Sequence, residues 1–239
     1  MAVNNKINNN QQATGLVVQY EANGEQVKLT PAMVKNYLVS GSGNVTDQEV
    51  MAFLSLCRYQ HINPFLREAY LIKYGSSPAT IVTGKDLFLK RAFRNPAFNG
   101  LQAGVLVWDG EKIQEREGTV KLLGEDVVGG WARVYVKGYE QPIYCSAAFD
   151  EYAGRKADGS LNNQWATKPA TMIRKVALVQ ALREAFPEDF SGLYSQEEMS
   201  VPATVQLDEQ PVIIDQAEPV KPEPVPAQTV EDALFGGEA

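Results

Sequence analysis

The side chains that could do chemistry in this sequence are basic, and they gather in two blocks. The first block runs from Arg58 to Arg94 and holds seven Lys and Arg residues against two acids. The second block runs from Trp165 to Arg183 and holds four bases and no Asp or Glu. Burying cations without a partner is costly, so these bases either pair with distant carboxylates or bind an anionic ligand. The pattern predicts a local electropositive surface of the kind that binds nucleic-acid phosphates.

The net charge of −7 conceals these basic blocks. Of the 29 acids and 22 bases in the chain, eight acids and one lysine lie in residues 200–239. Residues 1–199 are therefore neutral overall, and the acidic character belongs to the C-terminal tail. A low isoelectric point thus gives no reason to exclude a nucleic-acid partner.

Motifs that would indicate catalysis are missing from the sequence. The Gly84–Lys85 pair lacks the earlier glycine of a P-loop and is followed by Asp86, so ATP use is not expected. No G-x-S-x-G elbow occurs, and no acid has a lysine two residues later, as many metal-dependent nucleases require. One histidine and two distant cysteines exclude the usual zinc spacings.

A long helix must position the second basic block. Pro169 suits the first turn of a helix, residues 170–186 contain no Gly or Pro, and Pro187 ends the run. Apolar residues surround most of the axis of this helix, a pattern typical of a largely buried helix. The charged ends of its Lys and Arg side chains must therefore reach solvent through gaps between the packed elements, or form ion pairs within the core.

The remaining pattern predicts a mixture of helices and antiparallel strands. A capping box at Thr46–Glu49 begins a helix that runs to about residue 60. The other expected helices cover about 31–39 and 84–93, with a helical turn at 149–152. A hairpin is expected over 68–74 and 79–83, and further strands over 98–108, 118–123, 127–136 and 142–146.

Composition also predicts where the protein is found. The two cysteines look like small buried hydrophobes, which fits a reducing compartment. The sequence has no basic and apolar leader and no apolar run of 18 or more residues. We expect a soluble protein with no membrane partner, located in the cytoplasm.

The order and spacing of residues in two blocks resemble the RecT/Bet (Redβ) family of phage single-strand annealing recombination proteins. The first block contains Tyr59-Gln60-His61-Ile62-Asn63-Pro64-Phe65, Arg67-Glu68-Ala69-Tyr70, Gly84-x-Asp86-x-Phe88 and Asn95-Pro96-x-Phe98-x-Gly100. The second contains Trp165, Pro169, Met172-Ile173-Arg174-Lys175, Ala177, Gln180, Arg183, Ala185-Phe186 and Gly192-x-Tyr194. The similarity spans roughly residues 45–199, which makes it far more specific than any single short motif.

The resemblance implies an ATP-independent protein that binds single-stranded DNA and anneals it to a complementary strand in phage homologous recombination. It implies a ring or helical filament of identical subunits with the single strand and the annealed duplex in a basic groove. A phage 5′–3′ exonuclease is the implied partner, in the cytoplasm of the bacterial host. No catalytic residue, metal site or required cofactor is implied, although Mg²⁺ can assist annealing.

The resemblance also implies an α+β fold in which an antiparallel β-sheet packs on a long helix, as in Rad52-type annealing proteins. We divide the chain into a disordered N-terminus (1–15), a single-strand annealing DNA-binding domain (16–199) and a disordered acidic tail (200–239). Within the tail, Glu231–Phe235 is an acidic stretch that ends in a Leu-Phe pair. This stretch could bind a host single-strand-binding or replication protein, or the tail could be a solubilising segment with no partner.

Ten residues are candidates for DNA binding. By the resemblance, family bases stand at Arg67, Lys90, Arg174 and Arg183. Their location in the two blocks adds Lys73, Lys85, Arg91, Lys168 and Lys175, and Trp165 could stack on a base. Two helix positions where the family pattern can carry lysine are Ala170 and Val176 here, so known contacts do not transfer directly.

Two other functions stay open at the level of sequence. One is a metal-dependent nuclease that uses scattered carboxylates such as Glu68, Asp86 and Asp150. The other is a structural oligomer whose basic blocks are all paired internally. Strand shortening in the presence of Mg²⁺ would favour the first, and DNA affinity that does not respond to salt would favour the second.

Overall fold

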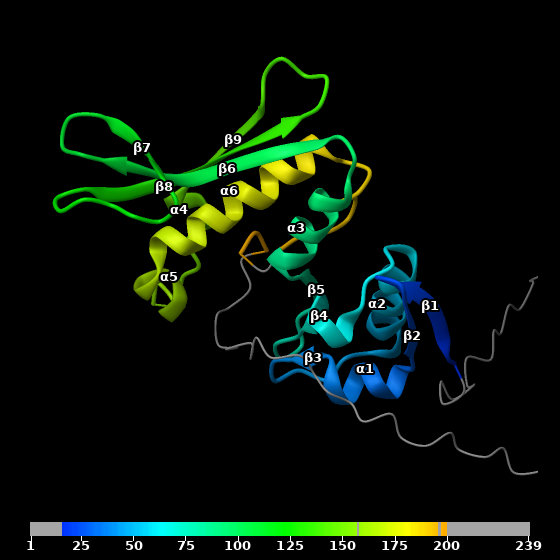
Figure 1. Cartoon of the computed structure of the whole chain (residues 1–239). Helices are drawn as coiled ribbons and strands as arrows, with labels where there is room; N and C mark the ends of the chain where they lie inside the picture. Colours follow the sequence, from blue (N-terminus) through cyan, green and yellow to red (C-terminus); the bar gives the residue numbers. More distant parts are fainter. Residues whose placement is uncertain (1–15, 157, 196, 200–239) are drawn as a thin grey trace, which may run out of the picture.

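The computed structural model of the chain describes residues 16–156, 158–195 and 197–199 (Figure 1). The predicted disordered segments 1–15 and 200–239 lie outside these residues. The elements form two regions that share one continuous hydrophobic cluster, which reaches from Tyr20 to Leu193. The first region contains a small sheet and short helices, and the second contains a larger sheet with a long helix beneath it (Figure 1).

The first region begins with a hairpin and two capped helices. Strands β1 (Val18–Ala22) and β2 (Glu25–Leu29) pair antiparallel across an Asn-Gly turn whose positive φ angles suit the twist of a tight hairpin. Helix α1 (Pro31–Tyr37) follows, with the Thr30 side chain capping its first turn. Helix α2 (Asp47–Tyr59) begins at the predicted capping box, in which the side chains of Thr46 and Glu49 each accept the other's backbone N–H.

A three-stranded sheet connects this region to the next helix. Strands β4 (Ala69–Ile72) and β5 (Thr80–Thr83) form the predicted hairpin, and β3 (Val39–Ser40) lies parallel to β4. Before β4, a short 3-10 helix (Pro64–Leu66) turns the chain. Helix α3 (Lys85–Arg94) follows β5 directly and carries four of the seven bases of the early block, Lys85, Lys90, Arg91 and Arg94.

The second region is an antiparallel sheet with the order β7-β6-β8-β9. Its strands are β6 (Phe98–Trp108), β7 (Ile113–Glu117), β8 (Asp126–Val136) and β9 (Ile143–Ala148). Three helices follow: α4 (Phe149–Tyr152), α5 (Asn163–Thr167) and α6 (Pro169–Ala185). Helix α6 covers one face of the sheet, whereas no described element covers the other face in the view of Figure 1.

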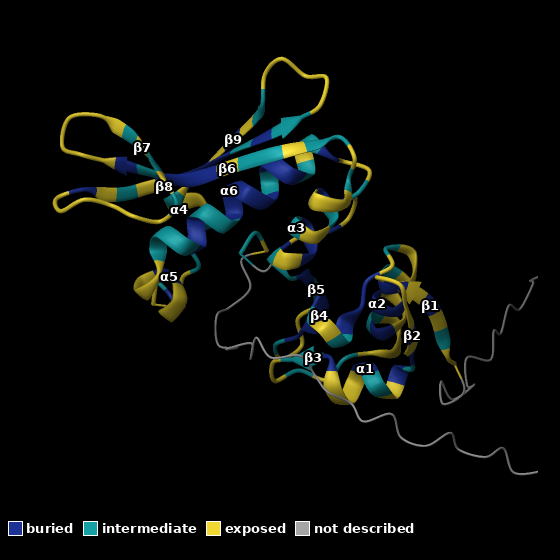
Figure 2. Ribbon diagram, in the orientation of Figure 1, coloured by how far each residue is buried: buried dark blue, intermediate teal, exposed yellow. Residues whose placement is uncertain are grey.

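Helix α6 packs closely on β8 because the facing strand carries a glycine. A Cβ atom at Gly130 would lie 2.4 Å from the backbone oxygen of Ile173, well inside van der Waals contact. Ile173, Val176 and Leu182 are fully buried in this contact region, and Figure 2 shows the helix as a mixture of buried and intermediate residues. Burying each of these side chains stabilises the fold by about 1.5–3 kcal/mol.

The fold class is confirmed as α+β, with an antiparallel sheet packed on a long helix. One predicted strand was wrong: residues 118–123 form a loop, and the strand that precedes it is Ile113–Glu117. Strand β7 lies at the edge of the sheet, and all of its residues except Ile113 are polar or charged, which hides it from a search for β-branched runs. Positive φ angles at Gly118 and Gly124 bend the chain out of the sheet.

Two further observations complete the fold. Helix α5 was not anticipated, although the Asn162 side chain that caps it is visible in the sequence as an N-cap residue. In the part of the chain that the structure describes, no helix combines the length and the apolar character that crossing a bilayer requires.

The contact between β8 and α6 leads to a stability prediction. Gly130→Ala is expected to lower the free energy of unfolding by about 1–3 kcal/mol, because the added methyl group forces the helix away from the strand. Ser146→Val, an enlargement at an exposed position of β9, is the control and should have little effect. Urea denaturation measures both, and equal stability of the two variants would contradict the close packing.

Candidate nucleic-acid interface

A polar pocket of about 340 Å³ brings the two basic blocks together. It is lined by four of the predicted DNA-binding residues: Arg67, Lys85, Lys90 and Lys175. The first three come from the early block and the last from α6, more than eighty positions later in the chain. Tertiary structure thus gathers cations that the sequence shows only as separate groups.

Local backbone geometry places the early cations on the wall of this pocket. Arg67 ends the 3-10 helix in the left-handed conformation, with φ at 58°. Gly84 caps α3, and a Cβ atom there would lie 2.9 Å from the Arg67 carbonyl oxygen. This close approach holds Lys85, the first residue of α3, beside Arg67. Lys90 follows on the same helix, five residues along.

Each lysine of the pocket has a carboxylate nearby. The Nζ atoms of Lys90, Lys85 and Lys175 lie 2.9, 3.5 and 3.3 Å from oxygens of Glu68, Asp86 and Glu197, respectively. The three lysine side chains keep 25–43% of their surface exposed. The exposed lysine end of each pair can turn toward a DNA phosphate, whereas the carboxylates of Glu68 and Glu197 are only 2% and 13% exposed.

The buried carboxylate of Glu68 stays satisfied if Lys90 turns toward a ligand. Glu68 is 2% exposed and also accepts hydrogen bonds from the backbone N–H of Asn63 at 2.8 Å and from the Asn23 side chain at 3.0 Å. Losing Lys90 would therefore leave Glu68 with two donors. Glu68 would then keep these hydrogen bonds but lose its counterion, as Glu49 would lose Lys73. The two pairs differ in the lysine, because the Lys90 side chain is 43% exposed and that of Lys73 is 7% exposed.

A second pocket of about 480 Å³ adjoins the first, and Leu87 and Lys90 line both. Arg91 lines the second pocket, but it donates hydrogen bonds to the carbonyl oxygens of Gln60 and Asp189. Its guanidinium therefore joins α2 to the turn after α6. Arg94, which is not one of the ten candidates named from the sequence, also lines this pocket. It lies four residues after Lys90, one turn along the same face of α3.

Lys73 has a structural position, so we exclude it from the interface. Its side chain is 7% exposed, and Nζ lies 2.7 Å from both carboxylate oxygens of Glu49. Glu49 also accepts the backbone N–H groups of Thr46 and Ala79. Breaking this network to release Lys73 would leave a partly buried carboxylate without its counterion.

Trp165 has a packing position as well. The residue is 3% exposed, and its ring contacts Phe149 edge to face with centroids 5.5 Å apart. No face of the indole is open to a nucleobase, which corrects the expectation that it stacks on DNA. Lys168, between α5 and α6, is exposed to solvent but does not line either pocket.

The other cations of α6 point away from the basic pocket. Arg174 donates from Nε to the carbonyl oxygen of Ala103 on β6 at 3.1 Å. Arg183 lies 2.6 Å from a carboxylate oxygen of Glu198, without hydrogen-bond alignment, and over the ring of Tyr194 at 4.7 Å. Neither residue reaches the site where Lys175 meets the early block.

The segment after α6 supplies two of these carboxylates. The backbone N–H of Thr83 on β5 donates to the carbonyl oxygen of Tyr194, and Thr83 forms a parallel bridge with Ser195. This attachment places Glu197 on the wall of the basic pocket and Glu198 beside Arg183. An acidic side chain thus occupies part of the space that a phosphate would use.

The three acids of the nuclease alternative do not form a metal site. Glu68 is buried in the contacts given above, whereas the Asp86 and Asp150 side chains are 79% and 92% exposed. Among the residues that the structure describes, no three His, Cys, Asp or Glu side chains are grouped so that they could hold a metal ion. No observation favours this function over DNA binding.

Comparisons with known proteins identify the family to which this chain is similar. A model of the RecT family matches residues 25–214, a range that includes every residue of both pockets except Asn23. An uncharacterized protein of Ureaplasma parvum serovar 3 is 29% identical to this chain over 144 residues. That match covers 59% of this chain and 56% of the relative, so it spans a little over half of the relative's own length.

The ion pair of Lys73 and Glu49 leads to a prediction about acid stability. The hydrogen bond from Lys73, together with backbone N–H groups of Thr46 and Ala79, lowers the pKa of Glu49 from 4.5 to about 2. A pKa that is lower in the folded state stabilises the fold above pH 4.5, and this stabilisation is lost as the pH falls toward 2.

Glu49→Gln should therefore lose less unfolding free energy than the wild type between pH 4.5 and 2, as measured by urea denaturation at a series of pH values. Glu140→Gln, at an exposed turn, is the control and should follow the wild type. Parallel pH profiles for Glu49→Gln and the wild type would show that the carboxylate has no such coupling to folding.

Proposed function

This chain belongs to the RecT family, whose members anneal single-stranded DNA in recombination, and we propose that it binds single-stranded DNA through the basic pocket and anneals it to a complementary strand. The observation that carries the proposal is the convergence of Arg67, Lys85, Lys90 and Lys175 on one pocket. Residues that bind phosphates in this way recognise the backbone of a strand, independent of its base sequence.

Annealing follows from where the cations lie. Two complementary strands repel each other through their phosphates, and a surface that neutralises one backbone lowers that repulsion. Phosphate contacts hold a strand in place, whereas base contacts would impose a sequence, so the bases stay available for pairing. Pairing and stacking supply the free energy, because the stacking of a duplex is worth about 1.4 kcal/mol per base-pair step.

The proposal uses no nucleotide cofactor and no catalytic residue. Mg²⁺ would assist as a counterion between the two strands, bound to the DNA and outside any protein site. The strands would come from a phage 5′–3′ exonuclease in the cytoplasm of the bacterial host. Contact of the acidic tail with a host single-strand-binding or replication protein is part of the same proposal, and the tail lies outside the described residues.

We propose an interface smaller than the ten candidates. Arg67, Lys85, Lys90 and Lys175 form its centre, because they line the pocket and the lysines are partly exposed. Lys168, which is exposed between α5 and α6, would be a contact farther along a strand, whereas Arg174 and Arg183 point away from the pocket and are left out of the proposed interface. Identical subunits side by side, in a ring or a helical filament, would extend the pocket into a continuous groove and make binding cooperative.

The first test of this proposal measures how DNA binding depends on salt. The variant Lys85→Ala/Lys175→Ala should weaken the binding of a labelled single strand and reduce the slope of log K against log salt by about 1.4, or 0.7 per lost phosphate contact. Lys112→Ala/Lys137→Ala removes the same charge from the larger sheet and should change the slope little. Equal slopes in the two double variants would exclude the pocket as the site.

An annealing assay tests the activity itself. Complementary oligonucleotides without ATP should pair faster in the presence of the protein, and the strands should keep their length when Mg²⁺ is added. Shortened strands would favour the nuclease, and pairing at the rate of free DNA would contradict the proposed activity.

The acid in the pocket leads to a second prediction. Glu197→Gln removes a carboxylate that competes with phosphate for Lys175, so it should tighten single-strand binding by up to about fivefold at low salt. Glu140→Gln raises the net charge equally at a distant turn and serves as the control. Fluorescence anisotropy measures both, and an unchanged or weaker affinity for Glu197→Gln would show that this carboxylate does not compete.

A further inference from the structure

The loop between β7 and β8 (118–125, called here the β7–β8 loop) carries three apolar side chains that face solvent. Val120, Leu122 and Leu123 are 69%, 57% and 105% exposed, the last more than in an extended reference chain. Exposed apolar residues are common one at a time, but three within four residues form a patch that marks an interaction surface.

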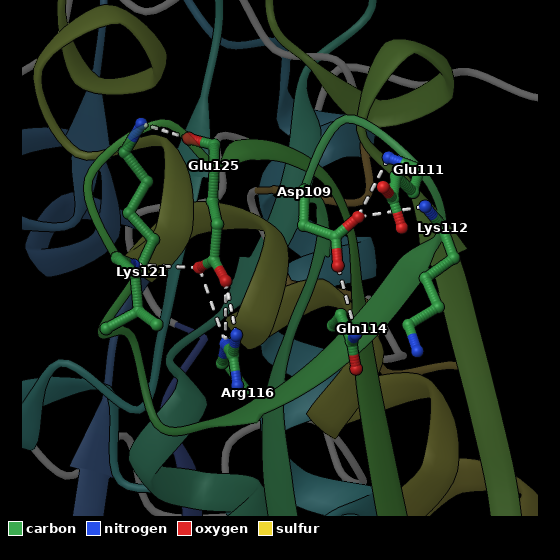
Figure 3. A network of polar contacts seen from close by, with 8 residues as sticks. Asp109, Glu111, Lys112, Gln114, Arg116, Lys121 and Glu125 are labelled. Carbon is green, nitrogen blue, oxygen red and sulfur yellow. Dashed lines mark hydrogen bonds and ion pairs between the residues drawn. The ribbon is translucent and has the colours of Figure 1, made fainter.

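The β7–β8 loop is held in place by a buried carboxylate (Figure 3). Glu125 is 4% exposed and accepts hydrogen bonds from the Arg116 guanidinium and, at 2.7 Å, from the backbone N–H of Leu122. Lys121 donates from Nζ to the Glu125 carbonyl oxygen at 2.7 Å. The pair with Arg116 lowers the pKa of Glu125, so the carboxylate stays charged.

These contacts make the patch a preformed feature. A flexible loop would lose conformational entropy on binding, whereas a loop already anchored at Glu125 loses little. The anchor also keeps Leu122 and Leu123 from folding back onto the sheet. The molecule thus presents apolar side chains on a rigid support at one end of the sheet.

Exposed acids outnumber exposed bases around the apolar tip, where the exposed bases are Lys112 and Lys121. Asp109 and Glu111 lie in the neighbouring β6–β7 turn, and Glu117 and Asp126 flank the loop itself. All four are exposed. A partner surface that receives the tip should therefore combine an apolar hollow with positive charge.

The second pocket of the same chain has that combination. Tyr59, which is 82% exposed, lines it together with Leu87 and Pro96. Its basic residues, Lys90, Arg91 and Arg94, outnumber its acids. The hollow of about 480 Å³ gives room for apolar side chains beside these cations.

The two surfaces belong to different parts of the chain, because the loop follows β7 whereas the second pocket is lined by residues at the end of α2 and on α3. In Figure 1, β7 and the loops at its end lie on the left, and α2 with the neighbouring hairpin lies on the right. A contact between two different surfaces of identical chains is heterologous, and repeating it generates a ring or an open filament.

We propose that the β7–β8 loop of one copy inserts Leu122 and Leu123 into the second pocket of the next copy, beside Tyr59. This inference rests on the proposed function, because it identifies the surfaces that place subunits side by side. Since the second pocket shares Leu87 and Lys90 with the basic pocket, the neighbouring subunit would lie next to the DNA-binding residues. The groove could then continue from one copy to the next.

Cysteine cross-linking tests the contact directly. Leu123→Cys and Tyr59→Cys are made in separate full-length chains, and the native Cys57 and Cys145 are buried and do not interfere. The two proteins are mixed, a single strand is added, and a short bismaleimide is applied. We expect a cross-linked dimer that contains one chain of each kind, and neither variant alone should give it.

Tyr37→Cys mixed with Leu123→Cys is the matched control, because Tyr37 is an exposed tyrosine (52%) on α1 that lines neither pocket. This mixture should give at most a tenth of the dimer formed with Tyr59→Cys. Equal yields, or no dimer with Tyr59→Cys, would overturn the proposed contact.

A second variant separates assembly from DNA binding. Leu122→Ser/Leu123→Ser should sediment as smaller species on long single strands, while its affinity for an oligonucleotide too short for two subunits stays within twofold of the wild type. Its thermal midpoint should not change, because the tip is exposed.

The two proposals fail in different ways. Wild-type assembly by the serine variant would overturn the loop contact and leave the proposed function intact. Failure of the wild-type protein to bind single-stranded DNA would instead overturn the proposed function.

Discussion

The burial of α6 between the four-stranded sheet and the rest of the core is the constraint on which the other features depend. Eight of its residues are buried, and Gly130 lets β8 approach its backbone closely. The Lys and Arg side chains of a helix enclosed in this way can reach solvent only where the surrounding layers leave a gap. The Lys175 side chain extends toward α3, whereas that of Arg174 extends toward β6 and that of Arg183 toward the segment after the helix.

The role of each cation then depends on how firmly its carboxylate partner is held. Lys73 and Glu49 form a closed pair with backbone donors around the carboxylate, so the lysine is part of the fold. Lys90 pairs with Glu68 while nearly half exposed, and Glu68 has other donors. A pair of this second kind is compatible with binding phosphate, because the exposed lysine can turn toward a ligand while the carboxylate keeps its hydrogen bonds.

The basic pocket and the proposed contact between copies use the same principle on different scales. Charges are kept in place by partners at the molecule's own surface until a ligand or a neighbour replaces those partners. Because the two pockets share Leu87 and Lys90, the proposed subunit contact and the proposed strand binding would take place next to each other. An annealing protein needs this arrangement if one strand is to pass along several identical subunits.

The sequence by itself determined the local elements whose signals lie within a few residues. The capping box at Thr46, the hairpin of β4 and β5, and the span of α6 between two prolines were all confirmed, as was the family. Edge strand β7 was missed because its polar and charged composition resembles that of a loop. The sequence also showed which bases were candidates, since charge is a property of residue type.

Only the tertiary structure showed which bases are partly exposed in a shared pocket and which are held by buried partners. The partner of Lys73 lies 24 positions earlier in the chain, and the partner of Lys175 lies 22 positions later. Trp165 is buried by Phe149, and no spacing rule connects them. The availability of a charge depends on solvent and on partners brought close by folding, and these are properties of three-dimensional packing that a linear pattern does not contain.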